Sequence, residues 1–125
     1  GNGMQIRDWL YVGDHTSALL KLSTDGDIGE SYCIGGGTEL SNLFLTKKIC
    51  SKFDKIKNSS KNPSDRLITF VEDRKGHDFR YSIDSSKLKK TINWNPSSEF
   101  DELIEKTIFW YLNNEDWVLK MLEND

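Results

Sequence analysis

The sequence contains few of the residues that build common metal and disulfide sites. It has two cysteines, Cys33 and Cys50, and two histidines, His15 and His77, among its 125 residues. The cysteines lack CxxC spacing and the histidines lie far apart, so the pattern does not predict a zinc or other metal site. Both cysteines stand among apolar residues, which favours buried free thiols in a reducing compartment.

Long apolar runs and a strong charge of one sign are also missing. No run approaches the ~20 residues of a membrane-spanning helix, and no signal-peptide pattern is present, which favours a cytoplasmic protein with no membrane partner. The net charge of −3 argues against binding of nucleic acid through its phosphates. One bound anion stays compatible with it, because a local group of cations can act against the overall sign. The opening Gly1-Asn2-Gly3 looks like a turn cut out of a longer protein.

The residues that are present predict one α/β domain over 1–125, with α+β character and a usable core. Its 36% hydrophobic and 30% charged residues are ordinary values for a globular protein. Alternation and helical periodicity predict three or four short strands and three to four helices. The expected strands are 6–12, 30–34, 67–71 and 80–83, and the expected helices are 14–22 capped by Asp14, 41–56, 84–90 and one starting near Ser98.

The loop 73–78 is the first candidate for a binding site. It gathers two cations, two carboxylates and the imidazole of His77 around Gly76, between two strand-like runs. Loops between regular elements often carry binding groups, and glycine lets a backbone turn sharply. Taken alone, the loop favours the simpler interpretation of a solvated turn whose charges cancel.

Arg7 is the second candidate, and two interpretations of it stay open. With Asp8 it forms either an edge-strand ion pair of little energy or a guanidinium directed at an anion. The planar donors of arginine suit phosphate because they bind two oxygens at once. Asn42, which follows three glycines at the start of a helix, is a neutral donor that could cap the helix or reach a ligand. His15 is better explained as a packing or capping residue.

No catalytic set and no cofactor fingerprint can be defended from the residues. The three glycines at 35–37 do not form the G-x-G-x-x-G pattern of a dinucleotide site. The remaining chemical signal is anion binding by Arg7, Arg74 and His77, with Asn42 as a neutral partner.

Four segments, in order, match the pattern of one family. They are Q-I-R-D-W-L-Y-V at 5–12, Y-C-I-G-G at 32–36, D-R-K-G-H-D-F-R-Y-S-I-D at 73–84, and W-N-P at 94–96 followed by the helix after Phe100. The chain resembles the C-terminal portion of dTDP-glucose 4,6-dehydratases, which are extended short-chain dehydrogenases/reductases. It departs from them at Cys33, Gly13 and Lys75, where the family has asparagine, an acid and proline. Lys75 frees the φ angle that proline fixes, so the loop loses rigidity.

The resemblance implies roles for the candidate residues. Arg7, Arg74 and His77 would contact the diphosphate of a nucleotide sugar, and Asn42 would contact the nucleotide. The loop 73–78 is then one part of a diphosphate clamp. The alternatives are another nucleotide-sugar dehydratase, epimerase or decarboxylase, or a non-catalytic binding module.

The resemblance also implies a division of labour. The NAD-binding Rossmann core, the Tyr-x-x-x-Lys pair and the acid/base pair would lie in an N-terminal domain that partners this segment. The full-length enzyme, a homodimeric lyase of deoxysugar and rhamnose precursor synthesis, would convert dTDP-glucose to dTDP-4-keto-6-deoxyglucose and water. This segment would bind no NAD and be inactive alone.

Overall fold

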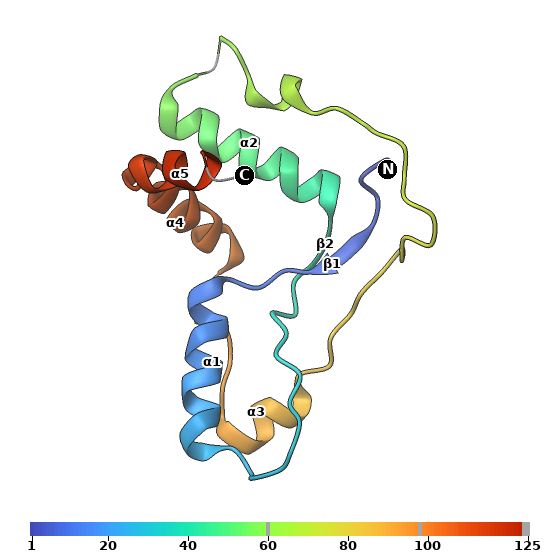
Figure 1. Cartoon of the computed structure of the whole chain (residues 1–125), viewed down its shortest axis with the longest axis vertical. Coiled ribbons are helices and arrows are strands. Elements are labelled where there is room, and N and C mark those ends of the chain that lie inside the picture. Colours follow the sequence, from blue (N-terminus) through green and yellow to red (C-terminus); the bar gives the residue numbers. More distant parts are fainter. Residues whose placement is uncertain (60, 98, 124–125) are drawn as a thin grey trace.

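The computed structural model describes residues 1–59, 61–97 and 99–123. Its elements in order are β1 (Ile6–Asp8), α1 (Val12–Asp25), β2 (Glu39–Ser41), α2 (Asn42–Lys57), the 3₁₀ helix η1 (Ser64–Leu67), α3 (Ser86–Ile92), α4 (Phe100–Asn113) and α5 (Glu115–Leu122). β1 and β2 pair antiparallel, with Ile6 opposite Ser41. Figure 1 shows this ribbon at the waist of an elongated molecule, between α1 with α3 and α2 with α4 and α5. No helix in the described ranges is long and apolar enough to cross a membrane.

The core of the α1–α3 end is small and tightly closed. Ala18 of α1 and Leu88 of α3 have no exposed surface, and Trp94 packs with them. The indole of Trp94 donates to Ser17 Oγ at 3.0 Å. Asp14 does not cap α1 as predicted, because the helix begins two residues earlier with Tyr11 at the N-cap. Its buried carboxylate instead accepts from Ser97 N and Oγ, at 3.2 and 2.5 Å.

A second core joins α2 to α4. Leu45, Ile104 and Ile108 are buried there, and Phe53 packs against them from the apolar stripe predicted for α2. Ser41 caps α2 by accepting a hydrogen bond from Phe44 N at 3.3 Å. Two lysines of α2, which the sequence places on a solvated face, form ion pairs across to α4. These pairs are Lys48 with Asp101 and Lys52 with Glu105.

The predicted strands are mostly wrong. The strand expected over 6–12 ends at Asp8, and the runs 30–34, 67–71 and 80–83 are extended but form no strand among the described residues. The one further pairing there is a single parallel bridge between Ile6 and Arg80. A strand requires a neighbour that supplies hydrogen bonds along its length. In the described chain the run 80–83 has only the short contact with Ile6, and the other two runs form no ladder.

Two other predictions also need correction. The described chain has five α-helices rather than three to four, because the last helical region divides at Asn114 into α4 and α5. The start expected near Ser98 lies outside the described residues, and α4 begins at Phe100. Cys33 is exposed rather than buried, since its segment joins no sheet, and Cys50 is half-buried; both thiols are free.

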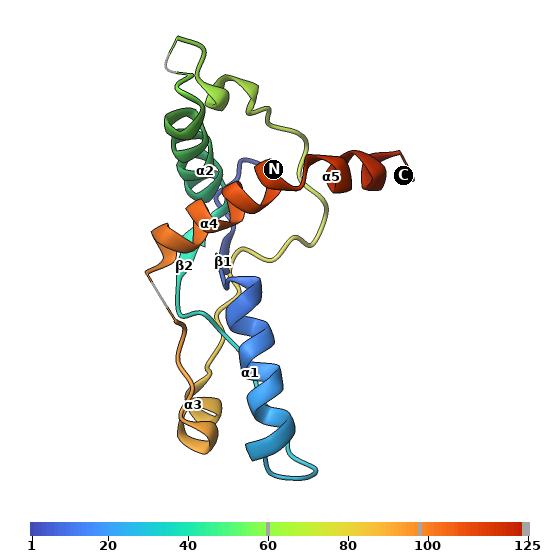
Figure 2. The same cartoon turned by 90° about the vertical axis from the view of Figure 1, so that its left-hand side faces the viewer.

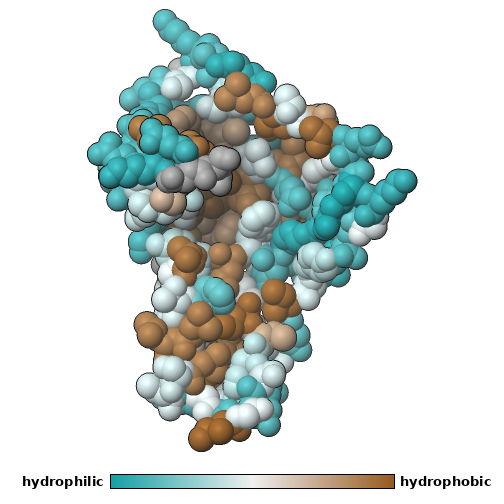
Figure 3. All heavy atoms as spheres, viewed as in Figure 1, coloured by the Kyte–Doolittle hydropathy of each residue, from teal (hydrophilic) through white to brown (hydrophobic). Residues whose placement is uncertain are grey.

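A long extended segment leads from η1 to α3. It runs down the side of the molecule opposite α1, α4 and α5 (Figure 1), while α5 projects away from the body (Figure 2). Many apolar side chains stay exposed, among them Leu20 at 67% and Val71 at 71%. Figure 3 shows apolar side chains gathered over the α1–α3 end and around a hollow in the other half. Contiguous exposed apolar surface is typical of sites that contact another protein or domain.

Candidate anion-binding site

β1 has hydrogen-bonded neighbours on both edges. β2 lies along one edge, and the residues that follow the loop 73–78 lie along the other. Ile6 N donates to Phe79 O at 2.7 Å, and Tyr81 N donates to Ile6 O at 3.1 Å. The loop therefore turns beside Arg7, although the two are about 70 residues apart in sequence.

A side-chain clasp fastens the segment after the loop to β2. Arg80 donates from Nε and Nη2 to the two carboxylate oxygens of Glu39, at 2.6 and 2.9 Å. Ser82 Oγ donates to the same carboxylate at 2.6 Å. The hydrogen bonds from Arg80 and then Ser82 lower the pKa of Glu39. This two-point geometry is the strong form of an arginine–carboxylate contact.

Arg7 reaches from β1 into the loop. Its Nη1 donates to Ile6 O at 2.7 Å and its Nη2 to Asp78 O at 3.1 Å, while Nη2 also lies 2.9 Å from His77 Nε2. The guanidinium stacks 4.5 Å from the centre of the Tyr81 ring, a cation–π distance. Of the two interpretations of Arg7, the structure excludes an ion pair with Asp8, whose carboxylate accepts from Thr38 N at 3.0 Å.

His77 completes a chain of polar contacts that begins on β1. Its Nδ1 lies 2.7 Å from Asp73 Oδ1, and Asp73 Oδ2 accepts from Gln5 Nε2 at 2.6 Å. The hydrogen bond from His77 is the main cause of a lowered pKa at Asp73. Gln5 is 6% exposed, so its buried amide fixes the carboxylate. Sequence reasoning did not single out Gln5 or give Asp73 a role. The available signal was the spacing of Gln5 and Arg7, since residues i and i+2 of an extended chain point to the same side.

The other two predicted residues stand apart from the Arg7–His77 contact. Arg74 is exposed, and its side chain makes no hydrogen bond or ion pair with any residue in the described ranges. Gly76, at φ +70°, supplies the left-handed turn of the loop. Asn42 begins α2, and its backbone N donates to Gln5 O at 3.0 Å. Its Oδ1 is buried without a hydrogen-bond partner in the part of the chain described here.

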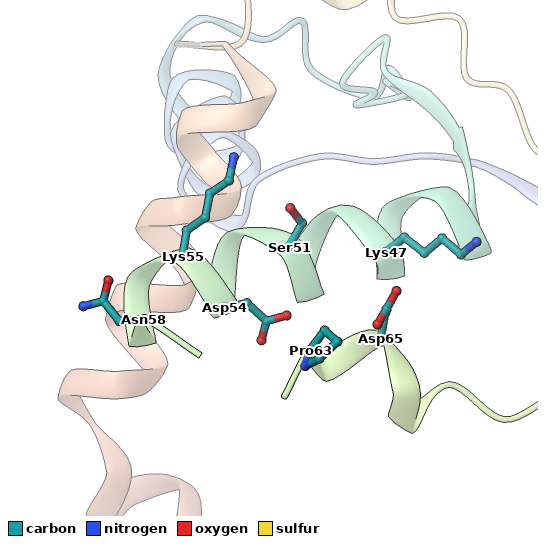
Figure 4. Close-up of a pocket in the computed structure, with 7 residues that line it drawn as sticks. All are labelled: Lys47, Ser51, Asp54, Lys55, Asn58, Pro63 and Asp65. Atoms are coloured by element: carbon teal, nitrogen blue, oxygen red, sulfur yellow. The ribbon is translucent and has the colours of Figure 1, made fainter. Parts of the chain in front are cut away.

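A separate hollow lies between α2 and η1 and contains none of the predicted site residues. Two lysines and two aspartates line it, so its charges are mixed, although Lys55 points away from the Asp54 and Asp65 carboxylates in Figure 4. Asp54 is already engaged, since it accepts from Ser64 N and Oγ at 2.8 and 2.5 Å. We therefore interpret this hollow as a gap left where η1 packs against α2, and we do not include it in the candidate site.

The histidines, cysteines and acids form no metal cluster among the described residues, and Gly35 and Gly36 serve packing. Within the described residues no three His, Cys, Asp or Glu side chains gather in a way that could hold a metal ion. The glycines at 35–37 belong to neither a strand nor a helix. A side chain at Gly35 would come within 2.6 Å of Asp8 Oδ2, and one at Gly36 would meet Trp9 O. Gly35 and Gly36 therefore permit close packing of this segment against β1 and the residues that follow it.

The fold and the candidate site define the chain as an α/β segment in which Arg7 of β1 meets His77 of the loop 73–78. The chain belongs to the GDP-mannose 4,6-dehydratase family, whose model matches residues 1–107. It is 46% identical over 126 residues to a dTDP-glucose 4,6-dehydratase of Escherichia coli. The matched region covers 98% of this chain and 35% of that relative. The chain thus spans about a third of the length of the relatives it matches.

Solved structures agree with this relationship. A dTDP-glucose 4,6-dehydratase of Bacillus anthracis in complex with NAD superposes with a TM-score of 0.78 at 35% identity, over 94% of this chain and 34% of that one. A dTDP-glucose 4,6-dehydratase of Streptomyces venezuelae, with NAD and TYD bound, gives 0.75 at 34% identity over the same shares. The fold is therefore that of the C-terminal part of these short-chain dehydrogenases/reductases, as the motif resemblance predicted.

Proposed function

We propose that residues 1–125 form the substrate-binding domain of a dTDP-glucose 4,6-dehydratase. The full-length enzyme is then a lyase that uses NAD to convert dTDP-glucose to dTDP-4-keto-6-deoxyglucose and water. The relatives named above support this reading. The observation that carries it is the approach of Arg7 Nη2 to His77 Nε2, at 2.9 Å, from distant parts of the sequence.

The four candidate residues take roles that match their positions. Arg7 and His77 bind the diphosphate from β1 and the loop, and the exposed guanidinium of Arg74 swings in from the same loop. Asn42, with its unsatisfied amide oxygen, contacts the nucleotide. Binding at this remote end of the substrate serves to orient the sugar for chemistry elsewhere in the enzyme.

The reacting groups and NAD belong, in this proposal, to an N-terminal domain. That domain covers part of the exposed apolar surface, which includes Val71. The full-length enzyme is a cytoplasmic homodimer without nucleic-acid or membrane partners. The 125-residue chain by itself is inactive, and formation of product by the pure chain would contradict this division.

The test is calorimetric binding of dTDP by the protein at its full encoded length. We expect Arg74→Ala to weaken binding by on the order of 1.5–3 kcal/mol, the range for a charged hydrogen bond. The matched control is Arg66→Ala, because Arg66 is also exposed but lies on η1. Unchanged affinity in Arg74→Ala would remove Arg74 from the site.

A second candidate function is another nucleotide-sugar enzyme, or a binding module without catalysis. The matching family model is described as GDP-mannose 4,6-dehydratase, which supports a substrate with a different base and sugar as the alternative. Competition among dTDP-, UDP- and GDP-sugars, followed by product analysis, separates these possibilities. Tighter binding of a GDP-sugar than of dTDP-glucose would replace the first proposal with the second.

A further inference from the structure

His77 is held between one group that only donates and one that only accepts. The guanidinium of Arg7, 2.9 Å from Nε2, has no acceptor atom, and the ionised carboxylate of Asp73, 2.7 Å from Nδ1, has no donor. A neutral imidazole satisfies both contacts only with its hydrogen on Nδ1 and its lone pair on Nε2. The neighbours therefore select one of the two neutral tautomers.

That arrangement excludes a protonated His77 in contact with Arg7. An imidazolium would direct an N–H at the guanidinium, and the two groups would repel each other as like charges. An anionic ligand reverses the preference, because phosphate oxygens only accept. His77 can bind such an oxygen through Nε2 only after that nitrogen has taken up a proton.

Asp73 is placed to stabilise the protonated ring. Its second oxygen accepts from the buried amide of Gln5 at 2.6 Å, so the position of the carboxylate does not depend on Arg7. Its lowered pKa keeps it charged through the neutral range. The charged and titratable groups around His77 are Arg7, Asp73, Arg74 and Asp78 with its Tyr81 partner.

We infer that Asp73 is a positioning residue that prepares His77 to take up a proton when a nucleoside diphosphate binds, so that ligand and proton bind together. In the free site His77 is neutral and accepts from Arg7. In the bound site Arg7 and an imidazolium both donate to the diphosphate, and Asp73 balances the added charge. This inference rests on the proposed function and adds a pH dependence to it.

The experiment measures proton uptake during binding by the protein at its full encoded length. The probe is thymidine 5′-diphosphate that carries one methyl ester on its β-phosphate. The ester removes the phosphate ionisation near pH 6, so the charge of the probe is constant from about pH 6 to about pH 8, and the probe has no hexose to react. Calorimetry in two buffers of different ionisation enthalpy gives the protons taken up. We expect uptake approaching one proton on the alkaline side, and affinity that rises by up to about tenfold per pH unit on acidification.

Three variants make the result specific. His77→Gln should bind weakly with no proton uptake, whereas His15→Gln, which alters the other, exposed histidine, should keep the wild-type uptake. Asp73→Asn should shift the pH at which affinity rises downward by about one unit, since the charge that favours the imidazolium is lost. A purely structural Asp73 would weaken binding equally at every pH.

The outcomes separate the two ideas. Failure of the probe to bind at any pH would overturn the proposed function and the inference together. Binding without proton uptake, or uptake that survives in His77→Gln, would overturn the inference and leave the proposed function standing. Nitrogen chemical shifts of the ligand-free protein add a direct check, because a neutral His77 with its proton on Nε2 would also overturn the inference.

Discussion

The two sides of the site are built to different degrees of rigidity. Arg7 stands on β1, whose backbone is hydrogen-bonded on both edges. The loop 73–78 has no regular partner in the described chain, and it is held by the bridge at Arg80, the clasp to Glu39 and the contacts of Asp73. Most of these contacts are between exposed side chains, and a segment held by such contacts opens locally at a low cost in free energy.

In the proposed site, this difference predicts distinct tasks for the two arginines. Arg7 is preorganised, since hydrogen bonds to Ile6 O and Asp78 O fix its guanidinium before any ligand arrives. Arg74 lies on the adjustable side and makes no such bond among the described residues. A fixed cation on a strand and a free one on a loop suit a ligand that is first held and then closed upon.

The largest expected effect comes from removing the fixed side. Arg7→Ala deletes the donor to the diphosphate and also two contacts that hold the loop, so we expect a loss of about 3 kcal/mol in calorimetric affinity for dTDP. Arg7→Lys keeps the charge without the planar fork and should lose an intermediate amount. If Arg7→Ala weakens binding less than Arg74→Ala, the strand is not the preorganised side.

The helices could be predicted from sequence because their signals are local. The stripe Leu45, Ile49, Phe53 and Ile56 predicted a helix over 41–56, and α2 spans Asn42–Lys57. The strands could not, since strand formation depends on a partner elsewhere in the chain. The run 67–71 has strand-like composition, yet Phe70 is 62% exposed and the run pairs with nothing described.

The candidate site was predicted only in part, because its residues come from distant parts of the sequence. Motif resemblance predicted roles for Arg7 and His77, and their approach follows from the bridge between Ile6 and Arg80, which no spacing rule reveals. The link through Gln5 and Asp73 was not predicted, because an amide and a carboxylate 68 positions apart give no joint signal in one sequence. The placement of Asn42 on the far side of Gln5 needed the structure for the same reason.

A smaller effect is expected from a substitution that disfavours the left-handed backbone conformation of the loop at Gly76. In Gly76→Ala the added Cβ meets no atom within 4 Å, but the residue must adopt φ +70°, which costs roughly 1–2 kcal/mol for an L residue. Gly29, at φ +83° and equally open, gives a matched control far from the site. Both variants should lower the free energy of unfolding alike in denaturant titrations, and only Gly76→Ala should also weaken dTDP binding. Equal binding in both would show that the loop conformation does not matter to the ligand.

The smallest expected effect tests the clasp through pH. Arg80 and Ser82 lower the pKa of Glu39 below its ordinary value of 4.5. A carboxyl with a depressed folded-state pKa adds stability above its unfolded pKa and loses it as the pH falls through the folded value. Denaturant midpoints should therefore fall on acidification below about pH 4.5, and Glu39→Gln should flatten that part of the curve. Glu72→Gln is the control, since the exposed Glu72 side chain makes no hydrogen bond or ion pair in the described ranges and should leave the slope unchanged. A slope equally steep in Glu39→Gln would mean that the clasp is screened by solvent and that the loop is held by Asp73 alone.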